Sequence, residues 1–251
     1  MKHHPLSVVM ITLNEEKNIA RAVKSVDWAD EICVADTGST DNTVSIAKNL
    51  GAHVGLIEFS GFGRAKQKAG AMASHEWILS LDADEVVTHE LKNNILKFLE
   101  NPGESAGAEF GRATNFCGNW ILHSGWYPEY VFRLFNKNKA WFNDKPLHES
   151  IKHSGKIKRI NGLLLHFSYP DIGEYKLKTK SYARLWADKR RDLPFASKLV
   201  FMFIKPLIAF IRKFVVQFGF ADGLPGLWIA AFSAYGQFLK HYYALKAKKT
   251  D

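Results

Sequence analysis

Cysteine is scarce in this chain, and a recognisable export signal is missing. Of its 251 residues only Cys33 and Cys117 are cysteines, and no C-x-x-C pair occurs. Two isolated cysteines exclude a disulfide-stapled scaffold or a cysteine-ligated zinc module, and they fit a reducing compartment. No long apolar run follows a basic start at the N-terminus, so we expect no signal peptide and a cytoplasmic location.

The C-terminal third is apolar but lacks an uninterrupted run that could span a membrane. A spanning helix needs about 20 apolar residues. The interrupting residues are Lys205, Pro206, Arg212, Lys213 and Asp222. In residues 207–218 the apolar side chains form one stripe with cations opposite, a pattern typical of a helix lying in a membrane interface. Helices packed as ordinary core, or a true span, are the alternatives.

The positive charge of the chain points to an anionic partner. The formal net charge is +9, which suits a phosphate-bearing substrate, an acidic lipid surface or nucleic acid. No helix-turn-helix or base-stacking module is recognisable, and acidic segments follow several predicted strands. We therefore expect a phosphate-bearing substrate and an anionic membrane surface as partners, and no nucleic acid.

Apolar strands and amphipathic helices alternate in the first ninety residues. Strands are expected at residues 6–11, 32–35, 52–59 and 77–81, with a helix after each. This order predicts an α/β fold with a doubly wound, mostly parallel sheet. We expect residues 1–170 to form this domain and residues 171–251 to form a basic, amphipathic helical extension.

Polar and acidic segments stand where three of these strands end. They are residues 12–16, 36–41 and 82–85, and the carboxyl edge of an open α/β sheet is where such folds bind ligands. Asp82 and Asp84 are alternate residues, about 7 Å apart on one side of an extended chain, close enough to share a divalent cation. The alternative is a strand-to-helix turn with acidic capping.

Two helix caps and one phosphate site are also expected. Asn14 can cap the first helix, and Glu85 the helix after the fourth strand. The glycine-rich entry at residues 60–63 leads into a helix with Arg64 and Lys66, which can bind phosphate. A solvated basic helix face is the alternative for that segment.

The second half mixes short strands with aromatic turns. Trp126 and Tyr127 suit stacking against sugar rings, although packing in a core or hairpin is the commoner role of such residues. Further on, His148 and Glu149 place an imidazole beside a carboxylate. This half could therefore hold a sugar acceptor and a proton-accepting group.

Four motifs in the first ninety residues together resemble those of family 2 glycosyltransferases of the GT-A fold. They lie in residues 12–16, 36–43, 66–67 and 82–84, in the order and loop positions expected. The resemblance implies a nucleotide-sugar donor and Mg²⁺ or Mn²⁺ as cofactor.

The second half is similar to a narrower branch, the lipopolysaccharide core β-1,4-glucosyltransferases that act on inner-core heptose. The matching segments are residues 125–128, 133–135, 148–149 and 219–223. This likeness implies glucose from UDP-glucose, a lipopolysaccharide core acceptor, and a peripheral location on the inner face of the cytoplasmic membrane. Related enzymes that act on other lipid-linked or cell-surface glycans share these segments.

The resemblance assigns roles to individual residues. Asp84 would bind the metal, with Asp82 and His148 as further candidate ligands. Many relatives have a second acid where this chain has Thr37. The residues implied for donor binding are Thr12, Leu13, Asn14, Glu16, Asp36, Lys66, Asp82 and Arg133.

The family is inverting, so one carboxylate must take the proton of the acceptor hydroxyl. Glu149 is our first candidate, with Glu129 and Asp144 as alternatives, and Trp126 and Tyr127 would line the acceptor side. A metal-dependent nucleotidyltransferase is the competing enzyme class, but its usual glycine-rich loop after the first strand is missing. A non-enzymatic binder is the third alternative.

Overall fold

The computed structural model describes residues 3–144, 150–190 and 195–246. Backbone contacts divide the chain into two compact units, which are described separately. Unit 1 comprises Met1–Arg112 and Glu129–His166, and unit 2 comprises Ala113–Pro128 and Phe167–Asp251. Unit 1 contains 19 lysines and arginines and 19 aspartates and glutamates, whereas unit 2 contains 15 and 6. The whole net charge of +9 therefore belongs to unit 2.

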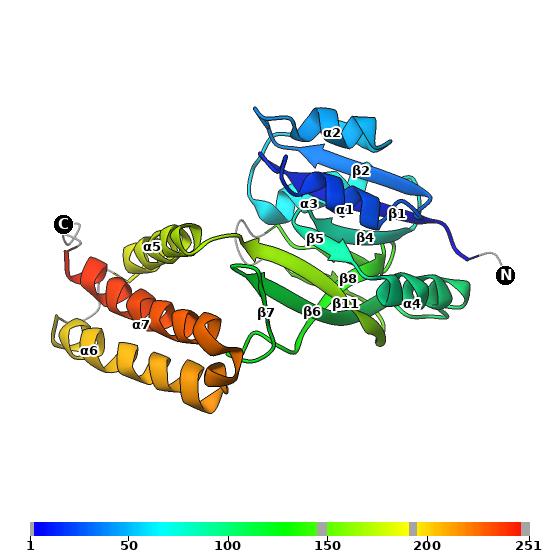
Figure 1. Ribbon diagram of the computed structural model, residues 1–251. Helices are drawn as coiled ribbons and strands as arrows, with labels where there is room; N and C mark the ends of the chain where they lie inside the picture. Colours follow the sequence, from blue (N-terminus) through cyan, green and yellow to red (C-terminus); the bar gives the residue numbers. More distant parts are fainter. Residues whose placement is uncertain (1–2, 145–149, 191–194, 247–251) are drawn as a thin grey trace. The chain divides into compact units, whose positions relative to one another are not determined.

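A parallel sheet forms the first part of unit 1, as the alternating pattern predicts (Figure 1). Its strand order is β3-β2-β1-β4, and every neighbouring pair is parallel. These strands are β1 (Leu6–Thr12), β2 (Glu31–Asp36), β3 (His53–Leu56) and β4 (Trp77–Asp82). Strand β3 is shorter than the expected 52–59, because Leu56 pairs with Asp36, the last residue of β2. Because β2 ends at Asp36, its pairing with β3 ends at Leu56.

Further strands extend the sheet beyond β4, and they pair in antiparallel fashion, so that the whole sheet contains both parallel and antiparallel pairs. Strand β8 runs antiparallel to β4 and to β6, and β5 runs antiparallel to β11. A separate antiparallel pair is formed by β9 and β10. The bounds are β5 (Glu85–Val87), β6 (Gly107–Phe116), β7 (Asn119–Ile121), β8 (Glu129–Asn136), β9 (Ala140–Phe142), β10 (Ile151–His153) and β11 (Ile157–Tyr169).

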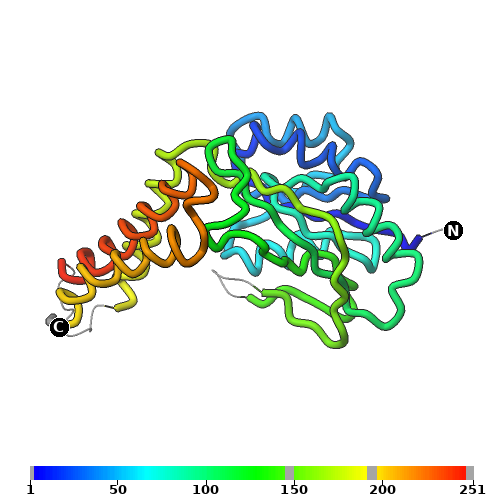
Figure 2. The backbone as a smooth tube through the Cα atoms, turned by 60° about the horizontal axis from the view of Figure 1, so that its bottom comes forward, coloured from blue at the N-terminus to red at the C-terminus, as the bar shows by residue number. Residues whose placement is uncertain are grey.

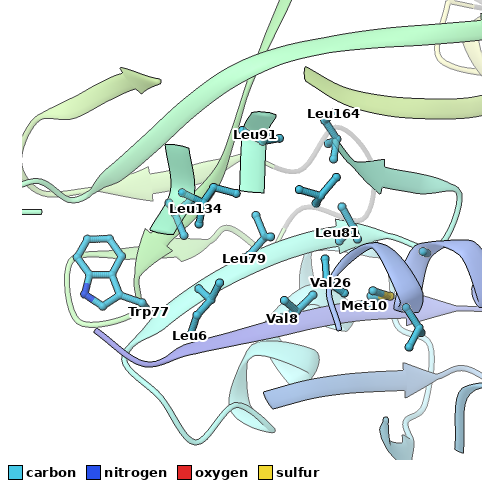
Figure 3. Close-up of a cluster of buried hydrophobic side chains, with 14 of the residues drawn as sticks. Leu6, Val8, Met10, Val26, Trp77, Leu79, Leu81, Leu91, Leu134 and Leu164 are labelled. Carbon is cyan, nitrogen blue, oxygen red and sulfur yellow. The ribbon is translucent and has the colours of Figure 1, made fainter. Parts of the chain in front are cut away.

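Helices cover both faces of the parallel strands. Leu6, Val8 and Met10 of β1 face the core shared with α1, α2 and α4, which Figure 3 shows in part. Val9 faces the other core, which contains Ala69 of α3. The predicted α/β fold is therefore confirmed. The helices are α1 (Ile19–Ser25), α2 (Thr43–Asn49), α3 (Phe62–Ala71) and α4 (His89–Glu100).

Both predicted helix caps are wrong. Helix α1 begins only at Ile19, and Asn14 instead adopts a φ of 56° and accepts a hydrogen bond from the backbone N of Thr40. Helix α4 is capped by Thr88, whose Oγ1 accepts from the backbone N of Leu91 at 3.2 Å. Glu85 lies in a strand and is fully buried. Asn14 and Glu85 each interact with residues distant in the chain instead of capping a helix.

Unit 2 is largely helical, in agreement with the predicted C-terminal helical region. Helix α7 packs against both α5 and α6, and Figure 2 shows the three lying side by side. The stripe expected in one helix over residues 207–218 is divided, because α6 ends at Ile211 and a π-helical turn follows. None of the described helices combines the length and apolar character needed to cross a membrane. The elements are α5 (Ile172–Asp188), α6 (Phe195–Ile211), η1 (Arg212–Val216), η2 (Gly219–Asp222) and α7 (Gly223–Lys246).

Candidate functional site

The carboxyl ends of β1, β2 and β4 meet at one edge of the sheet in unit 1. Thr12 pairs with Asp36, and Ile11 pairs with Asp82, so the polar segments that follow these strands start side by side. This placement was expected from the strand order alone. It brings the predicted donor residues of all three segments to one edge.

Hydrogen bonds join the first two of these loops. The backbone N of Asn14 donates to Ser39 Oγ at 2.9 Å, and that of Glu15 donates to Thr43 Oγ1 at 2.7 Å. The backbone N of Glu16 donates to Asp41 Oδ2 at 3.2 Å. Leu13 stands exposed between them. The two loops therefore form one rigid polar surface with an exposed leucine side chain.

Asp36 is committed to its own loop. Its carboxylate accepts hydrogen bonds from the backbone N of Gly38 and Ser39, both at 2.9 Å, and from the hydroxyls of Ser39 and Thr12. Burial alone would raise the pKa of Asp36, but these hydrogen bonds, led by Ser39, hold that pKa below its ordinary value. Asp36 thus shapes the loop that follows β2.

Asp82 is held between two cations. Lys66 Nζ lies 3.0 Å from Oδ1, and Arg133 Nη2 lies 2.5 Å from Oδ2. Burial alone would raise the pKa of Asp82, but the positive charges of Arg133 and Lys66 hold that pKa far below its ordinary value. Three of the predicted donor residues are therefore in direct contact, although Lys66 and Arg133 are 67 positions apart in the chain.

Glu85 is the centre of a buried ionic network that the sequence did not predict. Its Oε1 lies 2.9 Å from Arg112 Nη1 and 3.3 Å from Arg133 Nη2, and its Oε2 accepts from the backbone N of Asp82 at 3.0 Å. Arg112 also binds the carboxylate of Glu129 through Nε and Nη2. Glu85 therefore fixes the acidic loop and one of its cations together. Only the pairing of distant strands brings these groups into contact.

Asp84 contacts His166, a histidine that no sequence pattern singled out. His166 Nε2 is 3.2 Å from Asp84 Oδ2, and both side chains are mostly but not fully buried. The contact arises because β5 pairs with β11, which sets His166 opposite Glu85. Burial lowers the pKa of the neighbouring Arg21, while the charges of Asp84 and Glu15 raise it. Arg21 on α1 therefore also lies near this carboxylate.

The donor atoms of Asp84 and His166 fit a divalent cation that shares its coordination with a ligand. No cluster of three His, Cys, Asp or Glu able to hold a metal occurs in residues 3–144, 150–190 and 195–246. Two protein ligands suffice where substrate phosphate and water supply the others. Within the described segments, Nδ1 of His166 is buried without a hydrogen-bond partner. An imidazole ligand suits Mn²⁺ better than Mg²⁺, which prefers oxygen alone.

Of the candidate proton acceptors, the structure describes Glu129 and Asp144. Glu149 and His148 lie outside the described residues. Immediately before and after that segment, the backbone N of Asn143 donates to the carbonyl of Ser150 at 3.0 Å, and Asn143 Nδ2 donates to Ser150 Oγ at 2.6 Å. Asp144 is exposed. Both carboxylate oxygens of Glu129 accept from Arg112, as described above.

The predicted acceptor-side residues belong to unit 2. Trp126 packs edge-on against Phe116, with ring centroids 5.9 Å apart, and against Tyr175 at 6.1 Å. Its neighbour Tyr127 is half-buried. Trp126 thus forms part of a small aromatic core and is only partly buried, and its stacking against a sugar ring stays a prediction.

An α/β sheet with this acidic edge is typical of enzymes that bind nucleotides, and comparison with known proteins gives the family. The model for glycosyl transferase family 2 matches residues 7–154, and the chain belongs to that family. It is therefore a glycosyltransferase, and the predicted family is confirmed. This membership excludes the alternatives of a nucleotidyltransferase and of a non-enzymatic binder.

Two relatives span nearly the whole chain. An uncharacterized glycosyltransferase of Rickettsia typhi is 31% identical over 92% of this chain and 84% of its own length. The lipopolysaccharide core biosynthesis glycosyltransferase LpsC of Rhizobium meliloti is 27% identical over 97% of this chain and 95% of its own length. The chain therefore resembles these glycosyltransferases in its C-terminal region as well as in its catalytic family domain.

Among solved structures, glucosyl-3-phosphoglycerate synthase from Mycobacterium tuberculosis, in complex with Mn²⁺, UDP and glucosyl-3-phosphoglycerate, is 19% identical. The match covers 72% of this chain and 78% of that chain, with a TM-score of 0.47. A superposition this loose transfers neither a ligand nor a residue role to the present chain.

Proposed function

We propose that this glycosyltransferase moves a hexose, with glucose from UDP-glucose as the first candidate, onto an inner-core sugar of lipopolysaccharide. The observation that carries the proposal is the sheet edge where Asp84 meets His166 beside an Asp82 held by two cations. The likeness to a lipopolysaccharide core enzyme over almost the full length supports the acceptor class. Another lipid-linked or cell-surface glycan is the alternative acceptor.

The donor would bind across the three joined loops. The surface made by residues 12–16 and 36–43 would hold the nucleoside, and the diphosphate would lie near Asp82. Lys66 and Arg133 are both largely buried, and buried cations bind phosphate oxygens strongly. In the proposed sequence of events, the incoming diphosphate replaces Asp82 as the partner of these cations. Arg133 stays in place because Glu85 holds its guanidinium.

Asp84 and His166 would hold a divalent cation, preferably Mn²⁺. Such a cation, when bound, neutralises negative charge on the departing nucleoside diphosphate. Asp82, once the diphosphate has replaced it as the partner of Lys66 and Arg133, would act on the donor rather than on the metal. His148, a candidate ligand from sequence, lies outside the described residues.

The transfer would proceed by a single displacement with inversion. The acceptor hydroxyl oxygen forms a bond to the anomeric carbon of the sugar, the bond from that carbon to the diphosphate breaks, and a carboxylate takes the hydroxyl proton. We propose Glu149 as that carboxylate. Glu129 is less suited, because a proton on either of its oxygens would compete with hydrogen bonds from Arg112.

Two variants decide which carboxylate is the base. Glu149→Gln is expected to lower sugar transfer about 100-fold, within the range for loss of a general base, and to leave heat stabilisation by UDP unchanged. Glu129→Gln, the matched control, should transfer at close to the wild-type rate. The opposite order of the two transfer rates would make Glu129 the base.

A nucleotide-sugar screen tests the donor assignment. Purified protein with Mn²⁺ should hydrolyse UDP-glucose slowly without acceptor and should gain heat stability from UDP, because ligand binding to the folded state raises the unfolding temperature. GDP- and dTDP-sugars serve as controls. If no UDP-sugar is hydrolysed and UDP does not stabilise the protein, the proposed donor is wrong.

We further propose that residues 1–170 bind donor and acceptor while residues 171–251 attach the enzyme to the inner face of the cytoplasmic membrane. Unit 2 carries the whole net charge, and many of its large apolar side chains are exposed, a combination that suits a membrane surface. Between Phe203 and Leu224, the large apolar side chains that are more than half exposed are Phe203, Leu207, Ile208, Val215, Val216, Phe218, Phe220 and Leu224. Flotation with anionic vesicles, and not with neutral ones, is the expected result.

A further inference from the structure

The turn between α6 and α7 buries an aspartate that the proposed chemistry does not use. The side chain of Asp222, the last residue of η2, is 3% exposed. Its Oδ1 accepts from the backbone N of Leu122 and of His123, both at 3.1 Å, and His123 Nδ1 lies at the same distance. Its Oδ2 accepts from Ser124 Oγ at 2.7 Å. One carboxylate thus holds three consecutive residues of a loop about 100 positions earlier.

Two further contacts join the same loop to the same turn. The backbone N of Ser124 donates to the carbonyl of Gln217 at 2.9 Å, and Lys213 Nζ donates to the carbonyl of Ser124 at 2.8 Å. Gly219 of the turn lies so close to the loop that an added Cβ would be 3.1 Å from Ser124 Oγ, and it would be 2.6 Å from the carbonyl oxygen of Lys213 within the turn. The turn and the loop therefore behave as one rigid junction.

The outer side of this turn has the opposite character. Phe218, Phe220 and Leu224 are 58%, 53% and 71% exposed, and the cation Arg212 at the start of η1 is exposed as well. Exposed aromatic and aliphatic side chains, on a unit of net charge +9, are complementary to an anionic bilayer. We call these three apolar residues the apolar tip.

The far end of the loop carries the aromatic residue assigned to the acceptor. The backbone N of Trp126 donates to the carbonyl of His123 at 3.0 Å, and Tyr127 follows directly. A short bonded path therefore leads from the apolar tip through Asp222 and His123 to Trp126, all within unit 2. Displacement of the turn at a bilayer would be transmitted to the loop, because the six hydrogen bonds or close polar contacts between them would have to break for the turn to move alone.

We infer that Asp222 is a positioning residue that couples contact of the apolar tip with an anionic lipid bilayer to the conformation of the acceptor loop, residues 122–127. The inference rests on the proposed membrane attachment of this glycosyltransferase. It gives the buried carboxylate a role in the reaction: the loop is ordered where the lipid-linked acceptor is presented. The segment of residues 219–223, selected by sequence resemblance, thereby gains a physical explanation.

Hydrogen exchange with and without vesicles tests the coupling on the full chain. Vesicles of phosphatidylglycerol and phosphatidylcholine are compared with vesicles of phosphatidylcholine alone, and flotation measures binding. Amides of residues 122–126 should exchange about tenfold more slowly when wild-type protein binds the anionic vesicles. Asp222→Asn should still float, but its loop exchange should no longer respond to vesicles. An effect of Asp222 on folding alone would not depend on vesicles.

A second variant tests the apolar tip without touching the junction. Phe220→Ser combined with Leu224→Ser should float poorly while its loop exchanges in solution as in the wild type. Leu177→Ser on α5, which removes an equally exposed leucine of unit 2, should float normally. Normal flotation of the tip variant would overturn the inference. So would a wild-type dimer that is lost only in the tip variant, because the apolar tip would then contact a second copy of the chain rather than lipid.

The remaining outcomes separate the two proposals. If wild-type protein floats but its loop exchange does not change, attachment stands and the coupling is wrong. If Asp222→Asn responds like the wild type, Asp222 is not the link. Protein that floats with neither vesicle removes attachment and coupling together. Hydrolysis of UDP-glucose, measured in the same preparations without vesicles, reports on the sugar-transfer proposal independently.

Discussion

Replacing Asp84 by asparagine is expected to lower both UDP-glucose hydrolysis and sugar transfer about 1,000-fold. Loss of one group that stabilises transition-state charge commonly costs about 100- to 1,000-fold, and the proposed cation would lose its only carboxylate ligand among the described residues. The fold should persist, because Asp84 lies outside the ion pairs of Glu85 and contacts His166 instead. Initial rates at saturating Mn²⁺ measure the effect.

The binding of Mn²⁺ in the presence of UDP separates a metal role from a general loss of activity. Calorimetric titration should show weaker Mn²⁺ binding in Asp84→Asn and, to a smaller degree, in His166→Asn. Glu100→Gln, which changes an exposed acid at the end of α4, serves as the control and should match the wild type. Full transfer activity in Asp84→Asn, with unchanged Mn²⁺ binding, would remove the proposed site.

Glu85→Ala is expected to lower the free energy of unfolding by about 3–5 kcal/mol, the usual result of removing one partner from a buried ion pair. The carboxylate is fully buried, and its loss leaves Arg112 and Arg133 without their shared anion and the backbone N of Asp82 without its acceptor. Urea unfolding measures the change. The same variant should hydrolyse UDP-glucose poorly, because Arg133 and the acidic loop would both lose their support.

Glu129→Gln provides the comparison at the other end of the same network. Glu129 contacts Arg112 as Glu85 does, but its side chain is 45% exposed. Ion pairs that remain in contact with water contribute at most about 1 kcal/mol, so this variant should unfold within about 1 kcal/mol of the wild type. Equal destabilisation by both changes would mean that burial of Glu85 does not set its importance.

The sequence predicted those features that depend on neighbouring residues and on strand order. Continuous apolar runs identified the buried strands, and their alternation with helices placed residues 12–16, 36–41 and 82–85 at one edge of a parallel sheet. The family followed from motifs in the same loops. The local pattern is sufficient here because the spacing of apolar residues along the chain indicates whether the backbone is helical or extended. Consecutive strands joined by helices can also pair in only a few ways.

Local signals were misleading where a distant partner competed for the same side chain. Asn14 and Glu85 both stand at positions suited to cap a helix, but Asn14 is bonded to Thr40, and Glu85 is buried against Arg112 and Arg133. A capping bond contributes about 1 kcal/mol, whereas removing one partner from a buried ion pair costs about 3–5 kcal/mol. The buried ion pairs are therefore the stronger interaction, and Glu85 lies where it can form them.

By itself, then, the sequence determined the family, the α/β sheet and the edge that carries Asp82 and Asp84. Only the tertiary structure decided that His166 meets Asp84, that Lys66 and Arg133 hold Asp82, and that Asp222 holds the loop of His123. These pairs are far apart in the chain, and their contact depends on the register of distant strands and on the packing of a helical turn. A pattern of single residues records which face a side chain occupies, but not which side chain it meets there.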